Sequence, residues 1–188
     1  MNLYTAVLFV HAIAVLALTA ALTMEAWTLM QLRRAARASE ARPWTSGTRS
    51  IAIAAICSLV IIYATGAWLT ESLHSWAFAW PRLAVMEIAL FALLGILTGR
   101  RMRAIRRYTA GDAINPSEWN SLTQSVLLKV SLSTRIWIVI GTILLTAAKP
   151  GLRESLSIVA SSLILGLLFS LFSFGRGSAA STVHGESR

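Results

Sequence analysis

Five apolar stretches follow one another along the chain, and short polar segments separate them. Each stretch is close to the roughly 20 residues that an α-helix needs to cross a bilayer. The expected spans are residues 3–32, residues 51–70, a third that opens around Trp76, Trp80 and Pro81 and ends at Gly99, residues 118–148 and residues 155–174. The pattern therefore predicts an all-α, polytopic bundle of about five transmembrane helices.

The segments between these stretches predict different structures. Residues 40–49 contain Pro43 and Gly47 and show no apolar period, which is typical of a loop. Beyond Gly99, an arginine-rich segment is expected to continue the third helix into the lipid headgroups until residues 111–116 break it. The fourth helix is expected to be one long element over 118–148, whose polar first half emerges from the membrane.

Composition argues against a separate soluble domain. The 188 residues are 56% hydrophobic and 13% charged, with a mean hydropathy of +0.66, whereas a soluble domain has roughly a quarter charged residues. Residues 1–175 are therefore expected to form one transmembrane helical domain. Residues 176–188 are rich in glycine and serine, which predicts a disordered cytoplasmic tail.

Positive charge predicts the orientation of the bundle. The formal net charge is +9, and most basic residues lie in two of the connections between spans. They are Arg33, Arg34, Arg37, Arg42 and Arg49 in the first connection, and Arg100, Arg101, Arg103, Arg106 and Arg107 after the third span. Short loops rich in arginine stay in the cytoplasm, so the N-terminus is expected outside and the C-terminus inside. Arginines that flank spans do not form the separate basic face that nucleic-acid binding needs.

Five ionisable side chains fall inside the predicted spans and are the first candidates for function: His11, Glu25, Glu87, Lys129 and Arg135. A charge near the bilayer centre costs about 2.5 to 3.5 kcal/mol on insertion scales. With a rise of roughly 1.5 Å per residue, His11 and Glu87 lie about 10 Å and about 9 Å below the outer ends of their helices. They could meet in the outer half of the membrane, and Glu25 and Arg135 could pair in the other half.

Two interpretations of these five residues stay open. In the structural one, His11 bonds a backbone carbonyl, Glu25 and Lys129 snorkel to the headgroups, and Glu87 pairs locally with a hydroxyl. In the functional one, Glu87 and His11 serve a small proton-coupled transporter. Glu87 is the hardest of the five to explain by snorkelling, because its side chain is short.

The histidines raise the question of a cofactor. His11 and His74 could in principle clamp a haem iron between two imidazoles. His74, however, falls in a predicted turn rather than on a helix face. Haem binding, with His11 as axial ligand of an electron-transfer subunit, is therefore kept as one alternative, and the cofactor is unknown.

Small residues recur at helical spacing and allow helices to approach closely. The positions are Ala17 and Ala21 on the first span, Gly95 and Gly99 on the third, and Ser162, Gly166 and Ser170 on the fifth. These faces could pack within the bundle. They could also dock another membrane subunit or a second copy of the chain.

Several catalytic signatures are missing from the sequence. It has no phosphate-binding P-loop, no dinucleotide fingerprint, no H-E-x-x-H and no G-x-S-x-G. The leading hypothesis is therefore a non-enzymatic membrane protein, in the lipid bilayer, that acts as a subunit or assembly partner of a larger membrane complex.

A few short motifs carry a resemblance to a known family. Leu8, Phe9, Val10 and His11 occur early in the first span, Trp76 and Trp80 precede the third, Glu118 and Trp119 open the fourth, and Lys149 and Pro150 follow it. In these features the chain resembles a family of small bacterial integral membrane proteins that is distantly similar to copper-resistance-D-like membrane proteins. The resemblance implies a multi-pass protein of the bacterial inner (plasma) membrane. The copper analogy would make His11 a metal ligand, although the sequence lacks a methionine-rich segment.

Overall fold

The computed structural model describes residues 2–35, 38–110 and 116–172, and helices account for almost all of them. In chain order the elements are α1 (Leu3–Arg34), α2 (Ala38–Ser46), α3 (Thr48–Ser72), the short 3₁₀ turn η1 (Ser75–Ala77), α4 (Ala79–Thr109), α5 (Pro116–Thr123), α6 (Val126–Ala148) and α7 (Leu152–Phe172). Within these residues, α1, α3, α4, α6 and α7 are long and apolar enough to cross a membrane. The prediction of an all-helical bundle with five spans is confirmed.

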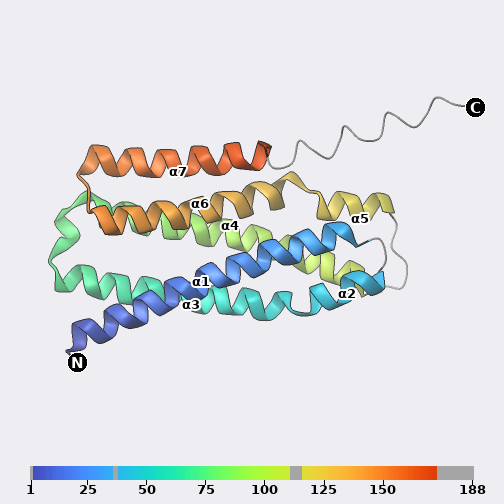
Figure 1. Ribbon diagram of the computed structural model, residues 1–188, viewed down its shortest axis with the longest axis horizontal. Coiled ribbons are helices and arrows are strands. Elements are labelled where there is room, and N and C mark those ends of the chain that lie inside the picture. Colours follow the sequence, from blue (N-terminus) through green and yellow to red (C-terminus); the bar gives the residue numbers. More distant parts are fainter. Residues whose placement is uncertain (1, 36–37, 111–115, 173–188) are drawn as a thin grey trace, which may run out of the picture.

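The five long helices run side by side, and the short helices α2 and α5 lie together at one end of the bundle (Figure 1). We call this the arginine-rich end, because the described arginines of residues 33–35, 38–49 and 100–107 lie there. Helix α1 packs mainly against α3, and α6 packs against both α4 and α7, whereas α3 and α4 touch in few places. Helix α7 lies at the edge of the bundle. The sparse contact between α3 and α4 leaves space between them.

The helix ends follow from local sequence. Asn2 caps α1, because its side chain accepts a hydrogen bond from the Thr5 amide at 2.9 Å. Helix α3 ends before His74 and helix α6 ends before Lys149, and both residues adopt the left-handed conformation, with φ of 49° and 47°. Pro150 and Gly151 then connect α6 to α7. The tight turn expected after residue 148 is therefore present.

The prediction that residues 40–49 form a loop is wrong, because α2 occupies most of this segment. Ala41 is fully buried and Trp44 packs against the cluster of Leu29, Ile105 and Trp119. A helix of nine residues that contains Pro43 is too short to show a recognisable apolar period in the sequence. Packing against the ends of α1 and α4, rather than helix propensity, stabilises this short helix.

The prediction of a single long fourth helix over 118–148 is also wrong in part. The chain breaks at Gln124 and Ser125, which separate α5 from α6. Trp119 is buried, and its indole Nε1 donates a hydrogen bond to the Ala35 carbonyl at 3.1 Å, while Arg33 Nε donates to the Thr123 carbonyl at 3.2 Å. Both contacts hold α5 against the end of α1, so α5 and α6 are separate helices.

Two apolar clusters form the core, and a polar layer lies between them. One cluster includes Leu22 and Ile138, and the other, toward the arginine-rich end, includes Leu29 and Leu128. Glu25 falls between Leu22 and Leu29 on α1. The proposed division into a domain over 1–175 and a tail over 176–188 concerns residues that lie partly outside the described ranges, and so does the end of the fifth span.

Candidate functional site

The polar layer is built around an ion pair between α1 and α6. Nη1 of Arg135 donates hydrogen bonds to both carboxylate oxygens of Glu25, each at 3.0 Å. The side chains are only 4% and 14% exposed, respectively. The structure thus joins the two residues that depth alone placed in the same half of the membrane. Glu25 does not snorkel to the headgroups.

The rest of the Arg135 guanidinium group meets α4. It lies over the ring of Phe91, with Cζ 4.6 Å from the ring centroid. Gly95 lies beside it, since a Cβ at that position would be in ordinary van der Waals contact with Cζ of Arg135, at 3.8 Å. Nε of Arg135 is buried and has no hydrogen-bond partner among the described residues. A buried N–H donor without a partner is unusual in a folded protein and points to a missing acceptor.

A cavity of about 620 Å³ adjoins this pair, and Glu25 and Arg135 are both part of its lining. Its walls come from α1, α3 and α4 and include the apolar side chains of Ala55, Leu59 and Phe91. The volume lies within the range of roughly 300 to 1,000 Å³ that is typical of small-molecule sites. The cavity is therefore large enough for a ligand.

Positive charge dominates the lining of the cavity. Besides Arg135, it includes Arg49 of α3 and Arg103 and Arg106 of α4, whereas Glu25 is the only acid among the described residues that line it. Within the described part of the chain, no hydrogen bond or ion pair engages the guanidinium groups of Arg49, Arg103 and Arg106. With Glu25 already held by Arg135, no described acid pairs with these three arginines at the arginine-rich end of the cavity.

One side of the cavity is bordered by exposed apolar side chains. Ile53, Ile56 and Val60 of α3 and Ile96 of α4 line the cavity and are also exposed on the surface of the bundle. They flank the space between α3 and α4, where the two helices touch little. This side of the cavity is therefore apolar and lies at the exposed surface of the bundle.

Glu87 occupies a separate polar contact, between α4, α6 and α7. It is 2% exposed; its Oε2 accepts a hydrogen bond from Thr142 at 2.7 Å, and its Oε1 accepts one from Ser162 at 3.3 Å. Each hydroxyl also lies within hydrogen-bonding distance of a backbone carbonyl of its own helix. The Thr142 hydroxyl is 2.9 Å from the Ile138 carbonyl, and the Ser162 hydroxyl is 2.8 Å from the Val159 carbonyl. A hydroxyl has one hydrogen, so the carboxyl and the carbonyls compete for these donors.

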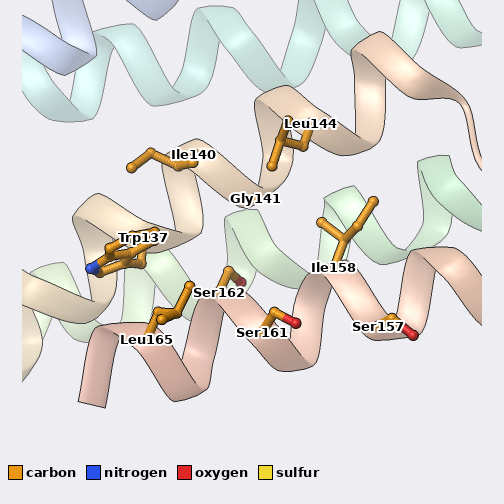
Figure 2. Close-up of a pocket in the computed structure, with 9 residues that line it drawn as sticks. All are labelled: Trp137, Ile140, Gly141, Leu144, Ser157, Ile158, Ser161, Ser162 and Leu165. Atoms are coloured by element: carbon orange, nitrogen blue, oxygen red, sulfur yellow. The ribbon is translucent and has the colours of Figure 1, made fainter. Parts of the chain in front are cut away.

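A shallow hollow of about 200 Å³ lies next to this contact, between α6 and α7. Figure 2 shows Leu165 and Ile158 of α7 opposite Trp137 and Leu144 of α6, with the hydroxyl of Ser161 between them. No charged side chain lines the hollow. It therefore suits an apolar side chain better than a charged ligand.

His11 and Glu87 do not meet, contrary to the expectation from their depths. Nδ1 of His11 is hydrogen-bonded to Thr65 Oγ1 of α3 at 2.8 Å, and Gly66 lies against the imidazole ring. Glu87 faces α6 and α7 instead. Equal depth places two residues in one layer but does not turn their helix faces toward each other. The proposed proton pathway through both residues therefore has no contact to support it.

The other polar candidates contribute little to a site. His74 is exposed in the turn between α3 and η1, and Lys129 is half-buried on α6, six residues before Arg135. Among the described residues, no group of three or more histidine, cysteine, aspartate or glutamate side chains could hold a metal ion. Haem binding through His11 and His74 stays a prediction.

The small residues serve two different purposes. Ser162, Gly166 and Ser170 are buried on one face of α7, and Gly166 is so close to α6 that a Cβ would lie 2.8 Å from the Thr134 Cα. Gly95 and Gly99 line the cavity instead of a helix contact. Ala21 belongs to the core and Ala17 is exposed. The face of α7 therefore packs inside the bundle.

The cavity was not recognised in the sequence, although part of its signal was present. Gly95, Gly99, Arg103 and Arg106 are spaced by four, four and three residues, which places them on one face of α4. Arg103 and Arg106, which served to predict the orientation of the bundle, thus share a helix face with Gly95 and Gly99, which served to predict helix packing. What the sequence lacks is the position of α3, which completes the cavity.

Comparison with known proteins identifies no family for this chain: no family model, no curated protein and no solved structure matches it. The resemblance to copper-resistance-D-like membrane proteins therefore stays a prediction. The cavity at Arg135 is the feature from which a function can be inferred.

Replacement of Glu87 tests whether it acts as a local hydrogen-bonding partner. Glu87→Gln keeps the size and both polar atoms, so we expect thermal stability in detergent close to that of the wild type. Glu87→Ala removes both hydrogen bonds and leaves a cavity, and we expect a loss of about 2 to 4 kcal/mol. If Glu87→Gln were as destabilising as Glu87→Ala, the negative charge itself would be required and local pairing would be the wrong explanation.

Proposed function

We propose that this protein is a non-enzymatic, multi-pass membrane protein that binds an anionic ligand in the cavity at Arg135. One observation carries the proposal: a buried guanidinium group with an unpartnered Nε–H lines a cavity of about 620 Å³. A carboxylate or phosphate offers several acceptor oxygens, and arginine binds such groups with two parallel hydrogen bonds.

The charges around the cavity also favour an anion. Glu25 balances Arg135 when no ligand is present, so the charge of Arg135 is not buried alone. Arg49, Arg103 and Arg106 remain to attract a negative group and to hold it. A cation would meet three positive charges at the arginine-rich end before it reached Glu25.

The lining supports binding rather than catalysis. Within the described part of the chain, Glu25 is the only acid in the lining, and both of its oxygens already accept hydrogen bonds from Arg135. Neither a histidine nor a cysteine is found among the described residues that line the cavity. A general base with a free carboxylate or imidazole is what catalysis would require there.

Filling the cavity tests the proposal. A Cβ at Gly99 would have no atom within 4 Å outside its own helix, and Gly99 lines the cavity, so we expect a phenylalanine there to occupy part of the cavity. We would extract the protein gently from its own membranes and measure the mass of the intact complex. The expected result is a bound non-protein mass in the wild type and in the matched Gly99→Ala variant, and its loss in Gly99→Phe.

Two outcomes would contradict the proposal. A wild-type protein that carries no additional mass after gentle extraction would leave the cavity without a ligand. Equal retention in Gly99→Phe and Gly99→Ala would show that the ligand binds elsewhere. Thermal unfolding of both variants checks that the bundle remains intact.

A role as a subunit or assembly partner of a larger membrane complex is the second candidate. The hollow between α6 and α7 supports it, because the exposed Ser157 and Ser161 lie four residues apart beside it, as in faces where transmembrane helices associate. The same mass measurement reports on this candidate. A second polypeptide, or a second copy of the chain, would be retained with the protein.

We also propose that the arginine-rich end faces the cytoplasm, with the N-terminus outside, and that the membrane is the bacterial inner membrane. The two arginine clusters support the orientation through the positive-inside rule, and the resemblance in sequence supports the location. A membrane-impermeant reagent applied from outside the cell should therefore leave the arginine-rich end unmodified.

A further inference from the structure

We infer that the anionic ligand is a glycerophospholipid of the surrounding bilayer, which enters the cavity sideways between α3 and α4. This inference rests on the proposed function and specifies its ligand class. The phosphate is expected between the arginines at the end of the cavity and Arg135, with the acyl chains along the apolar wall.

The shape of the opening supports entry from the bilayer. Ile53, Ile56, Val60 and Ile96 line the cavity and are at the same time exposed on the outside of the bundle. A ligand that arrived from water would not need an apolar opening at the depth of the hydrocarbon. A lipid could leave the bilayer through this opening while its chains stay in contact with apolar side chains.

The distribution of charge along the cavity matches an amphiphile. Three arginines that line the cavity lie at the arginine-rich end: Arg49 at the start of α3, and Arg103 and Arg106 on α4. The exposed apolar lining lies farther into the bundle. This order of positive charge followed by apolar surface is the order of headgroup and chains in a lipid. Basic pockets between transmembrane helices are known to hold anionic headgroups.

Arg135 extends the positive surface into the bundle. On α4, Gly95 lies beside its guanidinium group, and Arg103 comes eight residues later, or about 12 Å along the helix axis. Arginine side chains are long and flexible. Those of Arg103 and Arg106 can therefore approach a phosphate from the arginine-rich end, while Arg135 approaches it from the opposite side, deeper in the bundle. Arg135 is part of the cavity lining, and its buried Nε–H has no acceptor among the described residues.

The test compares lipids that differ only in the headgroup. Purified protein, stripped of lipid in detergent, would be titrated with dioleoyl phosphatidylglycerol or dioleoyl phosphatidylcholine and analysed by native mass spectrometry. Tighter binding of the anionic lipid is expected, by about tenfold or more. Glycerol 3-phosphate, a water-soluble anion with the same phosphate chemistry, is expected not to displace the lipid.

Two pairs of arginines on α4 provide a matched control. Arg103→Gln with Arg106→Gln removes two arginines that line the cavity, whereas Arg101→Gln with Arg107→Gln removes two exposed arginines that do not line it. Both double variants lose the same net charge from the same helix. The first is expected to lose most of the preference for phosphatidylglycerol, and the second is expected to keep it.

Each possible failure has a distinct meaning. If glycerol 3-phosphate bound and displaced the lipid, the anion site would stand and the lipid inference would be overturned. Equal binding of the two lipids, or an equal loss of preference in both double variants, would also overturn it. If neither lipid nor glycerol 3-phosphate bound to the stripped protein, the proposed function itself would fail.

Discussion

Replacing Glu25 alone by glutamine is expected to destabilise the protein by about 3 to 5 kcal/mol, which is the usual effect of removing one partner of a buried ion pair. The variant leaves the Arg135 guanidinium group among apolar side chains without its carboxylate. Both of its present hydrogen bonds go to Glu25, through Nη1. The amide oxygen of the glutamine can accept a hydrogen bond from Nη1, but it carries no negative charge to balance the guanidinium group.

Replacing both partners separates the ion pair from a simple loss of packing. Glu25→Gln combined with Arg135→Gln removes the two charges together, so we expect it to recover most of the stability lost in Glu25→Gln. Glu71→Gln, at the exposed end of α3, serves as the control for removing one negative charge. Thermal unfolding in detergent gives the order of stability. A double variant as unstable as Glu25→Gln would mean that the unpaired charge of Arg135 is not the cause of the lost stability.

A methyl group at Gly166 is expected to have the second large effect. Its Cβ would lie 2.8 Å from the Thr134 Cα, which is backbone and cannot move aside without moving α6. The Ser133 hydroxyl also donates a hydrogen bond to the Gly166 carbonyl at 2.7 Å, and a shift of α7 would break it. We expect Gly166→Ala to lower the free energy of unfolding by about 1 to 3 kcal/mol.

Gly99→Ala is the matched comparison, because a Cβ there has no atom within 4 Å. Alanine favours a helix over glycine by about 1 kcal/mol, so Gly99→Ala should leave stability unchanged or raise it. Proteolysis of the segment after α6 would report whether α7 separates from the bundle in Gly166→Ala. If the two variants had the same stability, the close contact between α6 and α7 would be contradicted.

The spans could be predicted because membrane-spanning helices have a required length and an apolar composition. The pairing of Glu25 with Arg135 could also be predicted, because a fixed rise per residue gives the depth of each side chain in the membrane. Depth alone did not predict the partners of His11 and Glu87. Their partners, Thr65 for His11 and Thr142 and Ser162 for Glu87, depend on which helix faces which.

The two short helices show what sequence periodicity misses. Helix α2 exists because Ala41 and Trp44 find a surface on α1 and α4, and α5 is separated from α6 because Trp119 bonds to the end of α1. In both segments, contacts with residues far away in the sequence determine the local structure. These contacts become visible only in the folded chain.

Small-residue spacing could not distinguish packing from open space. Gly166 and Gly99 occur in similar spacings, Gly166 with Ser162 and Gly99 with Gly95. The first lies against α6, while the second lines the cavity, and α3 and α4 touch in few places. The position of α3 relative to α4 creates the candidate site, and no short motif encodes it.

Photo-crosslinking in the native membrane tests most directly whether the cavity holds a ligand. Ile96 and Leu93 are both apolar positions of α4 and both 54% exposed, but only Ile96 lines the cavity. A benzophenone amino acid would replace one or the other, and the crosslinked species would be identified by mass after proteolysis. We expect a specific anionic lipid adduct at position 96 and only sparse, unselective bulk lipid at position 93. The same lipids in the same yield at both positions would contradict a ligand site in the cavity.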